Sequence, residues 1–430
     1  MPRLTSFAVH LLAIVGLLLG WNRPSAANAA APAPGVQPMA ARTDKVSTRI
    51  FGAVGVTFSP DGERLALLGF CDTTRKRLCV EVFDTRSWRP VALLDTPSER
   101  PGIIGGAVAF SPDGRRLAAG QHVLRVWTTG DWRAAFDIPG PFARGVFAAD
   151  VVIGMTFTGD GKSLAAVYRK AWYPQDVTVA TRGQIVDIDA ARLAAMRGGE
   201  APPHFPVDMV SFYDAATGRT IADAYPVGRD PMRGGSISAV SPVGNSSDIY
   251  AAWSKAEASD GPPPRRLAFY AGRLGPDAAQ PPVALPFLEP ATALTASDDG
   301  AGFIAGTSTG DRQSGFPRAS GDTGELPRNN DPILFHGVNG PASTATPPSG
   351  KVIALALTSK DDVISCNATA GENGPVQVWN PNTGALTASY AFGGLSPYQY
   401  LACAIDPTRR AVAIPAEGSG TEQLLIFHVR

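Results

Sequence analysis

The sequence predicts an all-β protein, a seven-bladed β-propeller of four-stranded antiparallel blades in which an N-terminal strand closes the ring. Three observations lead to this expectation. A strand-turn-strand unit occurs three times in the first half of the chain. Alternating apolar segments that end in an aromatic residue follow these units and supply third strands. The strand pattern then continues to the C-terminus, with enough segments for seven blades of the usual size.

The repeated unit joins the first two strands of a blade through a tight turn. An alternating apolar stretch runs into Ser-Pro-Asp-Gly or a close variant, and a second apolar run follows. Proline sets φ at the second turn position, aspartate bonds back to the backbone, and glycine accepts a positive φ. The three copies are Phe58–Gly62, Phe110–Gly114 and Phe157–Gly161, and their second strands are predicted over Leu65–Leu68, Leu117–Ala119 and Leu164–Val167.

The second half of the repeat provides the third and fourth strands of each blade. Third strands are predicted over Val80–Asp84, Leu124–Trp127, Val210–Asp214 and Val376–Asn380. Three of them lead into a Thr-Gly turn, at Thr129–Gly130, Thr217–Gly218 and Thr383–Gly384. The run after each turn, such as Thr387–Phe392, predicts an outer fourth strand.

The seventh blade is incomplete in sequence order. Inner strands are expected near Val54, Ala107, Val152, Ser236, Thr292, Ile353 and Leu401. The last blade stops at its third strand, Leu424–Val429, so its fourth strand must come from elsewhere. Lys45–Ile50 alternates and has the right length, and pairing it with the last blade would remove two exposed sheet edges. We therefore expect one domain over residues 45–430.

The repeats resemble WD40-type seven-bladed propellers, in particular their divergent bacterial members, in the Ser-Pro-Asp-Gly turn and the Val-x-Val-Trp strand. The match is close in the blades that hold Phe58, Phe110, Phe157 and Val376–Trp379. Over Ser236–Tyr270 and Ala291–Phe335 we expect the strands but not the turn motif. The family's Gly-His pair is absent, and its Trp-Asp pair is replaced by Trp127–Thr128 and Trp379–Asn380.

Residues 1–29 are predicted to be a secretory signal peptide. Arg3 precedes an apolar run over Phe7–Leu19, and the small-residue site Ala27–Ala29 follows, which is the order of regions in such signals. An uncleaved anchor is the alternative, although the run is short for a membrane span. After cleavage we expect no membrane span, a flexible Ala/Pro-rich linker over residues 30–44, and a periplasmic or secreted location.

Export gives the four cysteines a role, because disulfides persist in oxidising compartments. Cys71 and Cys79 flank the hairpin between the second and third strands of the first blade, and this local spacing favours a bond between them. Cys366 and Cys403 lie in the second strand of the sixth blade and the inner strand of the seventh. They are also disulfide candidates, with buried free thiols as the alternative, and other connectivities exist. Neither pair has the spacing of a zinc or redox motif.

Charge excludes one class of partner. The chain has 38 Lys and Arg against 38 Asp and Glu, and a nearly neutral protein lacks the basic surface that nucleic-acid binding requires. We expect a monomer with no nucleic-acid partner, no cofactor and no resident metal.

Several chemically suggestive patterns are interpreted as structural or coincidental. Gly306–Gly310 spells the Gly-x-Ser-x-Gly of hydrolases, but that motif requires a strand-to-helix turn in a parallel α/β sheet. Asp187, Asp189 and Asp208 lack the spacing of a cation-binding loop. The histidines after the predicted signal form no metal-binding pair at short spacing, and they are His122, His204, His336 and His428. Asn245 and Asn367 begin glycosylation signals, which matter only in a eukaryotic secretory pathway.

Long loops are predicted on one face. The connections between second and third strands hold most of the added length, over residues 168–207, 254–266, 307–331 and 367–375. Loops on a rigid scaffold commonly carry binding sites. In the longest insertion Arg169, Trp172 and Tyr173 combine a cation with two aromatic rings, the residue types that dominate binding hot spots. The alternative is that the rings only pin the insertion to its blade.

Two functions follow from this arrangement. The preferred one is a scaffold that docks a protein partner of unknown identity on the loop-decorated face and has no chemistry of its own. The alternative is a secreted propeller enzyme or cofactor-binding protein, lactonase-like or quinoprotein-like, that uses the mouth of the central channel. The chain lacks the Trp-bearing docking motif and the adjacent cysteine pair of quinoproteins, so the enzyme is the less favoured of the two.

Overall fold

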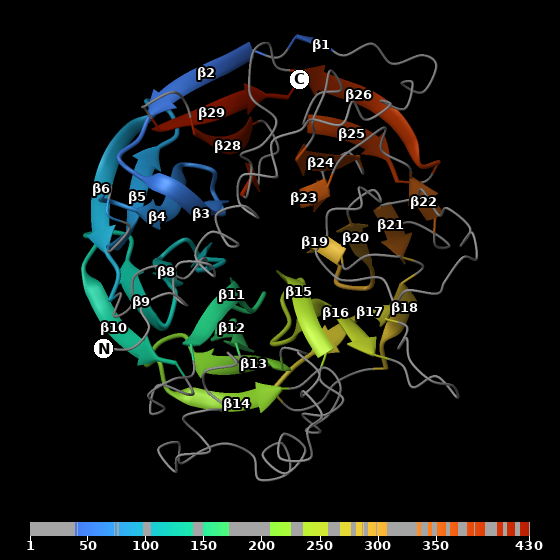
Figure 1. Ribbon diagram of the computed structural model, residues 1–430, viewed down its shortest axis with the longest axis horizontal. Helices are drawn as coiled ribbons and strands as arrows, with labels where there is room; N and C mark the ends of the chain where they lie inside the picture. Colours follow the sequence, from blue (N-terminus) through green and yellow to red (C-terminus); the bar gives the residue numbers. More distant parts are fainter. Residues whose placement is uncertain are drawn as a thin grey trace, which may run out of the picture. The chain divides into compact units, whose positions relative to one another are not determined.

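The computed structural model describes residues 39–40, 42–72, 74, 77–97, 105–140, 149–171, 207–224, 235–256, 267–276, 281–285, 287, 291–297, 299–307, 333–336, 343–345, 351–357, 362–368, 376–381, 383–391, 402–406, 411–417 and 422–429. All of them belong to one compact unit, Ala33–Arg430. Every regular element among these residues is a strand, and seven sheets stand around a ring (Figure 1). The predicted fold class is confirmed.

Six blades take four consecutive strands each. Blade 1 contains β3 (Phe51–Phe58), β4 (Arg64–Phe70), β5 (Leu78–Asp84) and β6 (Arg89–Asp95), and blade 2 contains β7 (Ala107–Phe110), β8 (Arg116–Gly120), β9 (Val123–Thr128) and β10 (Ala134–Pro139). Blade 3 contains β11 (Ala149–Phe157), β12 (Ser163–Ala171), β13 (Val207–Asp214) and β14 (Thr220–Ala224), and blade 4 contains β15 (Gly235–Pro242), β16 (Ile249–Ala256), β17 (Leu267–Leu274) and β18 (Val283–Leu285).

The remaining strands complete the ring. Blade 5 contains β19 (Ala291–Ala296), β20 (Phe303–Thr307), β21 (Ile333–His336) and β22 (Ser343–Ala345), and blade 6 contains β23 (Lys351–Leu357), β24 (Val363–Ala368), β25 (Val376–Asn380) and β26 (Ala385–Ala391). Blade 7 contains β27 (Ala404–Ile405), β28 (Ala411–Glu417), β29 (Glu422–His428) and the N-terminal β2 (Arg42–Ser47). The inner strands lie at the predicted places, except that Leu401 is outside the described residues and the seventh inner strand begins at Ala404.

The N-terminal strand closes the ring as predicted, but it begins earlier than residue 45. Strand β2 pairs antiparallel with β29, with Val46 opposite Leu424. Ahead of it, β1 (Met39–Ala40) pairs in parallel with β26 of blade 6. Part of the stretch expected to be a linker, residues 30–44, is therefore strand, because the open edges of two outer strands offer backbone partners to it.

Polar contacts hold both ends of the closing strand. His428 Nε2 lies 2.9 Å from Asp44 Oδ2 across the β29–β2 pair, and this hydrogen bond lowers the pKa of Asp44. At the other end the buried Glu81 of blade 1 accepts hydrogen bonds from Thr48 Oγ1 at 2.6 Å, Arg49 N at 2.8 Å and Arg49 Nε at 2.9 Å. The segment between β2 of blade 7 and β3 of blade 1 is thus held by three hydrogen bonds to the Glu81 carboxylate.

Apolar side chains fill the spaces between neighbouring blades. Between blades 7 and 1, Phe58 and Phe83 pack with Leu424 and Ile426, and all four are buried. Burial of apolar surface is the main favourable term in folding. Because each blade is covered on both faces by its neighbours, the closed ring is the unit that buries the core.

The turn between first and second strands has the predicted chemistry. In blade 1, Ser59 Oγ donates to Asp61 Oδ1 at 2.5 Å, Glu63 N donates to the same oxygen at 2.9 Å, and Gly62 has a φ of 69°. Blade 5 repeats this turn although the sequence there was expected to lack it. Ser297 Oγ donates to Asp299 Oδ1 at 2.6 Å and Gly300 has a φ of 69°, because Ser-Asp-Asp-Gly keeps every group except proline.

The turn between third and fourth strands differs from the prediction in one blade. In each of these turns the residue four positions after the last residue of the third strand has a positive φ. This residue is Gly218 in blade 3 and Gly384 in blade 6. In blades 1 and 2 this position is held by Trp88 and Trp132, with φ of 53° and 55°. Gly130 is therefore not the left-handed residue of its turn, and a tryptophan that packs on the core takes that place.

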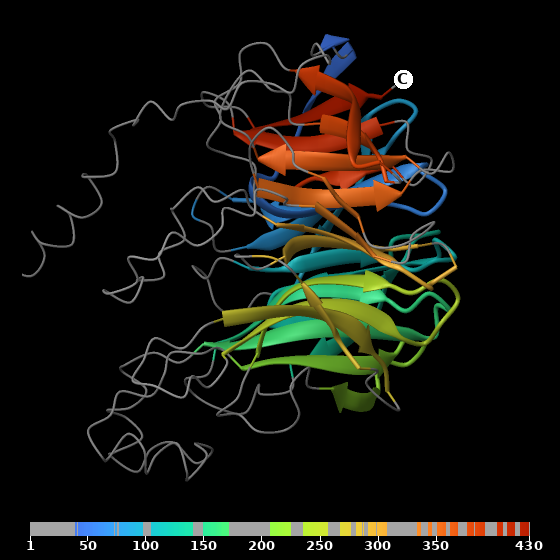
Figure 2. The same ribbon diagram turned by 90° about the vertical axis from the view of Figure 1, so that its right-hand side faces the viewer.

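Strand alternation separates the connections into two sets. Seen from the side in Figure 2, the strands run across the thickness of the ring, so that their ends meet at two opposite faces. Turns between first and second strands and between third and fourth strands lie at one face, which we call the turn face. Connections between second and third strands lie at the other, which we call the loop-bearing face.

Candidate functional site

The loop-bearing face is defined by the ends of second strands and the starts of third strands. Four of the seven pairs of ends border the connections predicted to be long, and they are Ala171 and Val207, Ala256 and Leu267, Thr307 and Ile333, and Ala368 and Val376. The connections between them, and with them Trp172 and Tyr173, lie outside the described residues. Arg169 is the one predicted contact residue that the structure places.

Arg169 belongs to a strand and not to the insertion. Strand β12 continues to Ala171, and Arg169 faces Asp208 across the β12–β13 pair. Arg169 Nε donates to Asp208 Oδ1 at 3.0 Å and Nη2 donates to Oδ2 at 2.8 Å, a bidentate ion pair. Nη2 also donates to Ser236 Oγ at 2.7 Å and to the Ile237 carbonyl at 3.1 Å. The guanidinium therefore joins blade 3 to the inner strand of blade 4.

Asp208 is the buried anchor of this cluster. Its side chain is fully buried, and it also accepts a hydrogen bond from Ile237 N at 2.6 Å. Burial raises the pKa of Asp208, and the hydrogen bonds and charge of Arg169 oppose that shift without cancelling it. Both carboxylate oxygens already have donors. Asp208 is thus an internal partner of Arg169, and Asp187 and Asp189 lie outside the described residues.

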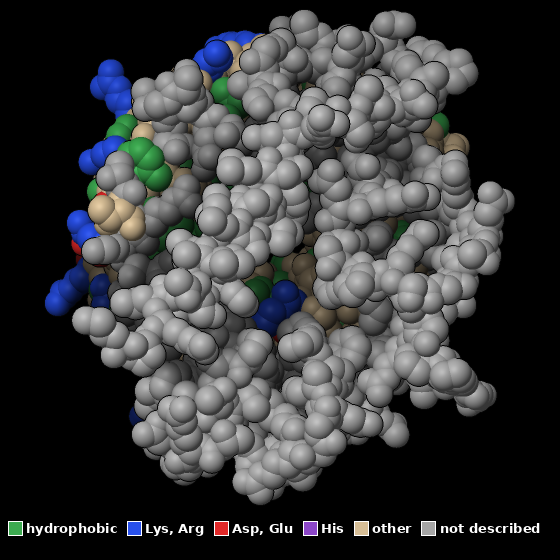
Figure 3. Space-filling model, viewed as in Figure 1, with side chains coloured by type: hydrophobic (Ala, Val, Ile, Leu, Met, Phe, Trp, Pro, Cys, Tyr) green, Lys and Arg blue, Asp and Glu red, His purple; other side chains and the backbone are tan. Residues whose placement is uncertain are grey.

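The Arg169 side chain is only partly buried by the described residues. Its side chain is 34% exposed, and no atom among the described residues accepts a hydrogen bond from Nη1. In the space-filling view, Lys or Arg surface is visible between β11 and β15 near the middle of this face (Figure 3). A guanidinium held by a buried carboxylate loses little entropy when it donates to a carbonyl or carboxylate.

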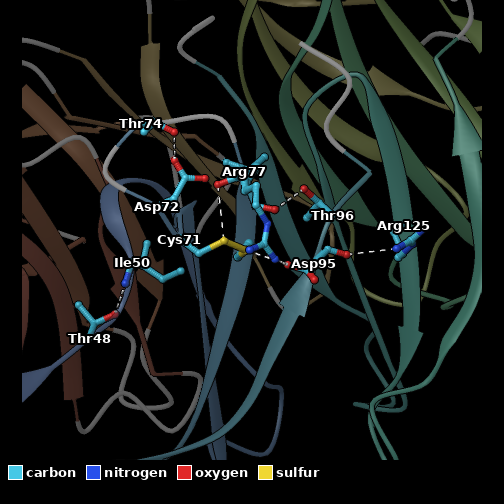
Figure 4. Close-up of a disulfide and its surroundings, with 11 residues drawn as sticks. Thr48, Ile50, Cys71, Asp72, Thr74, Arg77, Asp95, Thr96 and Arg125 are labelled. Atoms are coloured by element: carbon cyan, nitrogen blue, oxygen red, sulfur yellow. Dashed lines mark hydrogen bonds and ion pairs between the residues drawn. A yellow bond between two sulfur atoms is a disulfide. The ribbon is translucent and has the colours of Figure 1, made fainter. Parts of the chain in front are cut away.

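Both cysteine pairs form disulfides. Cys71 and Cys79 join the ends of β4 and β5 with Cα atoms 5.6 Å apart, and Cys366 of β24 joins Cys403, just before β27, with Cα atoms 6.6 Å apart. The described part of the chain contains no free cysteine. Figure 4 shows Arg77 and Asp95 beside the first bond, with Arg77 Nη2 donating to Asp95 Oδ1 at 2.5 Å. The second bond links blade 6 to blade 7.

A buried polar cluster runs along β24 and β25 of blade 6. Trp379 Nε1 donates to Ser365 Oγ at 2.9 Å, and Asn367 Nδ2 donates to Gln377 Oε1 at 2.9 Å. The indole therefore keeps a side-chain partner although Asn380 stands where the WD40 motif has Asp. Asn367 is fully buried, so it cannot carry a glycan.

The other candidate patterns take structural places. Gly306 and Thr307 end β20 in an antiparallel blade, which is not the setting of a hydrolase elbow. His428 pairs with Asp44, and the ring of His336 lies 5.0 Å from that of Phe303. His204 is outside the described residues. On the turn face Arg115 is exposed beside the Asp113–Gly114 turn.

No helix among the described residues is long and apolar enough to cross a membrane. No model of a known protein family matches this chain, and no curated protein matches it either. The seven-bladed propeller is thus the class of protein that the fold defines.

Proposed function

We propose that this propeller is an exported, WD40-type scaffold that docks a protein partner on its loop-bearing face. The observation that carries the proposal is the asymmetry of the two faces. Short hydrogen-bonded turns make up the described turn face, whereas second and third strands on the other side are joined by connections as long as residues 172–206. Binding residues concentrate on long loops that a rigid scaffold positions.

Two further observations support this proposal. Arg169 is fixed by Asp208 and Ser236, and its side chain is 34% exposed close to the start of the longest connection. The two disulfides are compatible with an oxidising compartment, as expected for a periplasmic or secreted protein. The repeated Ser-Asp-Gly turn and the Trp379–Ser365 hydrogen bond favour the WD40 type.

The test compares substitutions on the two faces. The protein is immobilised, exposed to periplasm or medium from its source, and the retained proteins are identified and quantified. Replacing Trp172 and Tyr173 together by Ala should reduce retention of the bound partner at least about tenfold, as loss of two aromatic anchors does. The matched control replaces Arg115 and Arg116 by Ala on the turn face and should leave retention unchanged. Retention that survives the first change and is lost with the second would assign binding to the turn face.

A further inference from the structure

One group of side chains in the described part of the chain has the composition and spacing of a metal site. The sulfur atoms of Cys71 and Cys79 and a carboxylate oxygen of Asp95 all lie within 4.8 Å of one another. Strand pairing brings them together, because Gly69, Cys79 and Asp95 lie side by side on β4, β5 and β6. Cys71 is two residues beyond Gly69 and so lies at the same end of the blade.

The contact between Asp95 and Cys79 is not a hydrogen bond when Cys79 is part of the disulfide. Asp95 Oδ1 lies 3.2 Å from Cys79 Sγ, but a disulfide sulfur has no proton to donate. The carboxylate is held instead by Arg77 Nη2 at 2.5 Å. A carboxylate aimed at two sulfur atoms becomes favourable once those sulfurs share a cation with it.

We propose that the reduced chain binds one zinc ion through Cys71, Cys79 and Asp95, and that formation of the Cys71–Cys79 disulfide releases it. Two thiolates and a carboxylate suit this borderline-soft ion, with water as fourth ligand. In tetrahedral coordination two zinc-bound sulfurs lie about 3.7 Å apart and a sulfur and an oxygen about 3.6 Å apart. On reduction the two sulfur atoms need only move apart to about 3.7 Å. Asp95 Oδ1 already lies 3.2 Å from Cys79 Sγ, close to the sulfur–oxygen distance of such a site.

The charges and the surroundings fit this assignment. Two thiolates, one carboxylate and Zn²⁺ sum to one negative charge, and the Arg77 guanidinium on Asp95 balances it. Arg77 then acts as the outer hydrogen-bond donor that orients a ligating carboxylate. Its side chain is 61% exposed and that of Asp95 is 62% exposed, whereas Cys79 is buried and Cys71 half-buried, so solvent and the ion reach the site from the side of Asp95.

The redox step is a thiol–disulfide exchange. A small-molecule disulfide such as glutathione disulfide accepts two electrons from the two zinc-bound thiolates. One S–S bond forms between Cys71 and Cys79, the bond of the oxidant breaks, and Zn²⁺ and two free thiolates leave. Each disulfide formed therefore releases one zinc ion.

The experiment isolates this pair in a Cys366→Ser/Cys403→Ser variant of the protein. It is reduced with a phosphine without oxygen and titrated with Zn²⁺ against a chromophoric chelator. We expect one zinc per chain, and Co²⁺ in its place should give thiolate-to-cobalt charge-transfer absorption. Adding glutathione disulfide should release the zinc one for one with disulfide formed, and the oxidised protein should bind none.

Substitutions separate a three-ligand site from binding by thiols alone. Asp95→Asn in the same background should weaken zinc binding by at least the roughly tenfold that a lost supporting group costs. Asp223→Asn is the control, because Asp223 is also exposed on an outer strand, β14 of blade 3, where it accepts a hydrogen bond from Ser211 Oγ at 2.7 Å. It should not change zinc binding. Failure of the reduced protein to bind zinc, or equal affinity with Asn at position 95, would overturn the proposal without removing either cysteine.

Discussion

Two buried carboxylates, Glu81 and Asp208, join neighbouring parts of the ring through hydrogen bonds. Glu81 and Asp208 are each about 1% exposed, and each accepts hydrogen bonds from one arginine and one backbone N–H. Removing a carboxylate from water is costly, and several charged or backbone donors offset that cost. Both acids bind a neighbouring segment rather than their own strand, so they fix the approach of chain segments far apart in sequence.

Asp208 should make stability depend on pH in a defined direction. Its pKa is raised by burial, so the folded state holds the proton more tightly than the unfolded state does. That contribution is present at low pH and is lost as pH rises through the folded pKa. We expect the stability of the protein relative to Asp208→Asn to fall as pH rises above the ordinary range of an aspartate.

Urea unfolding of both proteins between mildly acidic and neutral pH measures this difference. Asp223→Asn, a change at an exposed position on the outer strand of the same blade, is a suitable reference. If the unsubstituted protein instead became more stable relative to Asp208→Asn as pH rises, the hydrogen bonds and charge of Arg169 would outweigh the effect of burial on Asp208.

The tight turns of the turn face work through a serine or threonine, an aspartate and a glycine. The hydroxyl and carboxylate satisfy the backbone of the turn in blades 1, 2, 3 and 5. Glycine takes the left-handed conformation that other residues adopt only at a cost. Proline is dispensable, since blades 3 and 5 form the turn without it.

A pair of glycines in blade 2 tests this turn. Gly114 has a φ of 68° with only Pro60 Cδ near, at 3.9 Å, whereas Gly130 lacks a positive φ and has nothing within 4 Å. Gly114→Ala should lower the free energy of unfolding by about 1 kcal/mol through backbone strain alone. Gly130→Ala should be neutral or stabilising by up to about 1 kcal/mol. Urea unfolding of the two variants measures both values, and equal losses would contradict the role given to Gly114.

The two disulfides should differ in their contribution to stability. Cys71–Cys79 closes a hairpin of sequence separation 8 within one blade, and Cys366–Cys403 spans 37 residues and joins two blades. In the chain-entropy account they contribute about 2–3 and about 4 kcal/mol. Paired Cys→Ser variants, unfolded in urea under oxidising conditions, should show the larger loss for the second pair. A larger loss for the first would indicate that ring closure does not depend on the bond between blades 6 and 7.

The molecule as a whole depends on closure by its N-terminal strand. Blade 7 has only three strands from the C-terminal part of the chain, and β2 supplies the fourth. Val46 of β2 is buried in the layer between blades 7 and 1. The closing strand therefore covers both a hydrogen-bonding edge and apolar surface.

Two truncations separate the closing strand from the segment ahead of it. A protein that begins at Phe51 lacks β2, exposes the edge of β29, and should melt at lower temperature and aggregate. A protein that begins at Arg42 keeps β2 and loses only β1, so it should stay close to the full chain. Calorimetry and light scattering measure both effects. An unchanged melting temperature for the protein that begins at Phe51 would contradict the closure.

The sequence by itself determined the propeller, its seven blades and the strand that closes it. These features rest on local chemistry, because strand alternation and turn residues act over a few positions. Even the blade 5 turn was readable from Ser297, Asp299 and Gly300 once proline is not required. The bond between Cys71 and Cys79 was equally local.

Only the tertiary structure decided which distant side chains meet. Asp208 is 39 residues from Arg169 in the chain, and Cys403 is 37 residues from Cys366. Asp95 reaches Cys71 and Cys79 from an outer strand, which no cysteine spacing reveals. Trp132 takes a left-handed turn position because its ring packs on the core of blades 1 and 2. Such contacts depend on the register between strands and on the packing of whole blades, which a pattern of neighbouring residues does not contain.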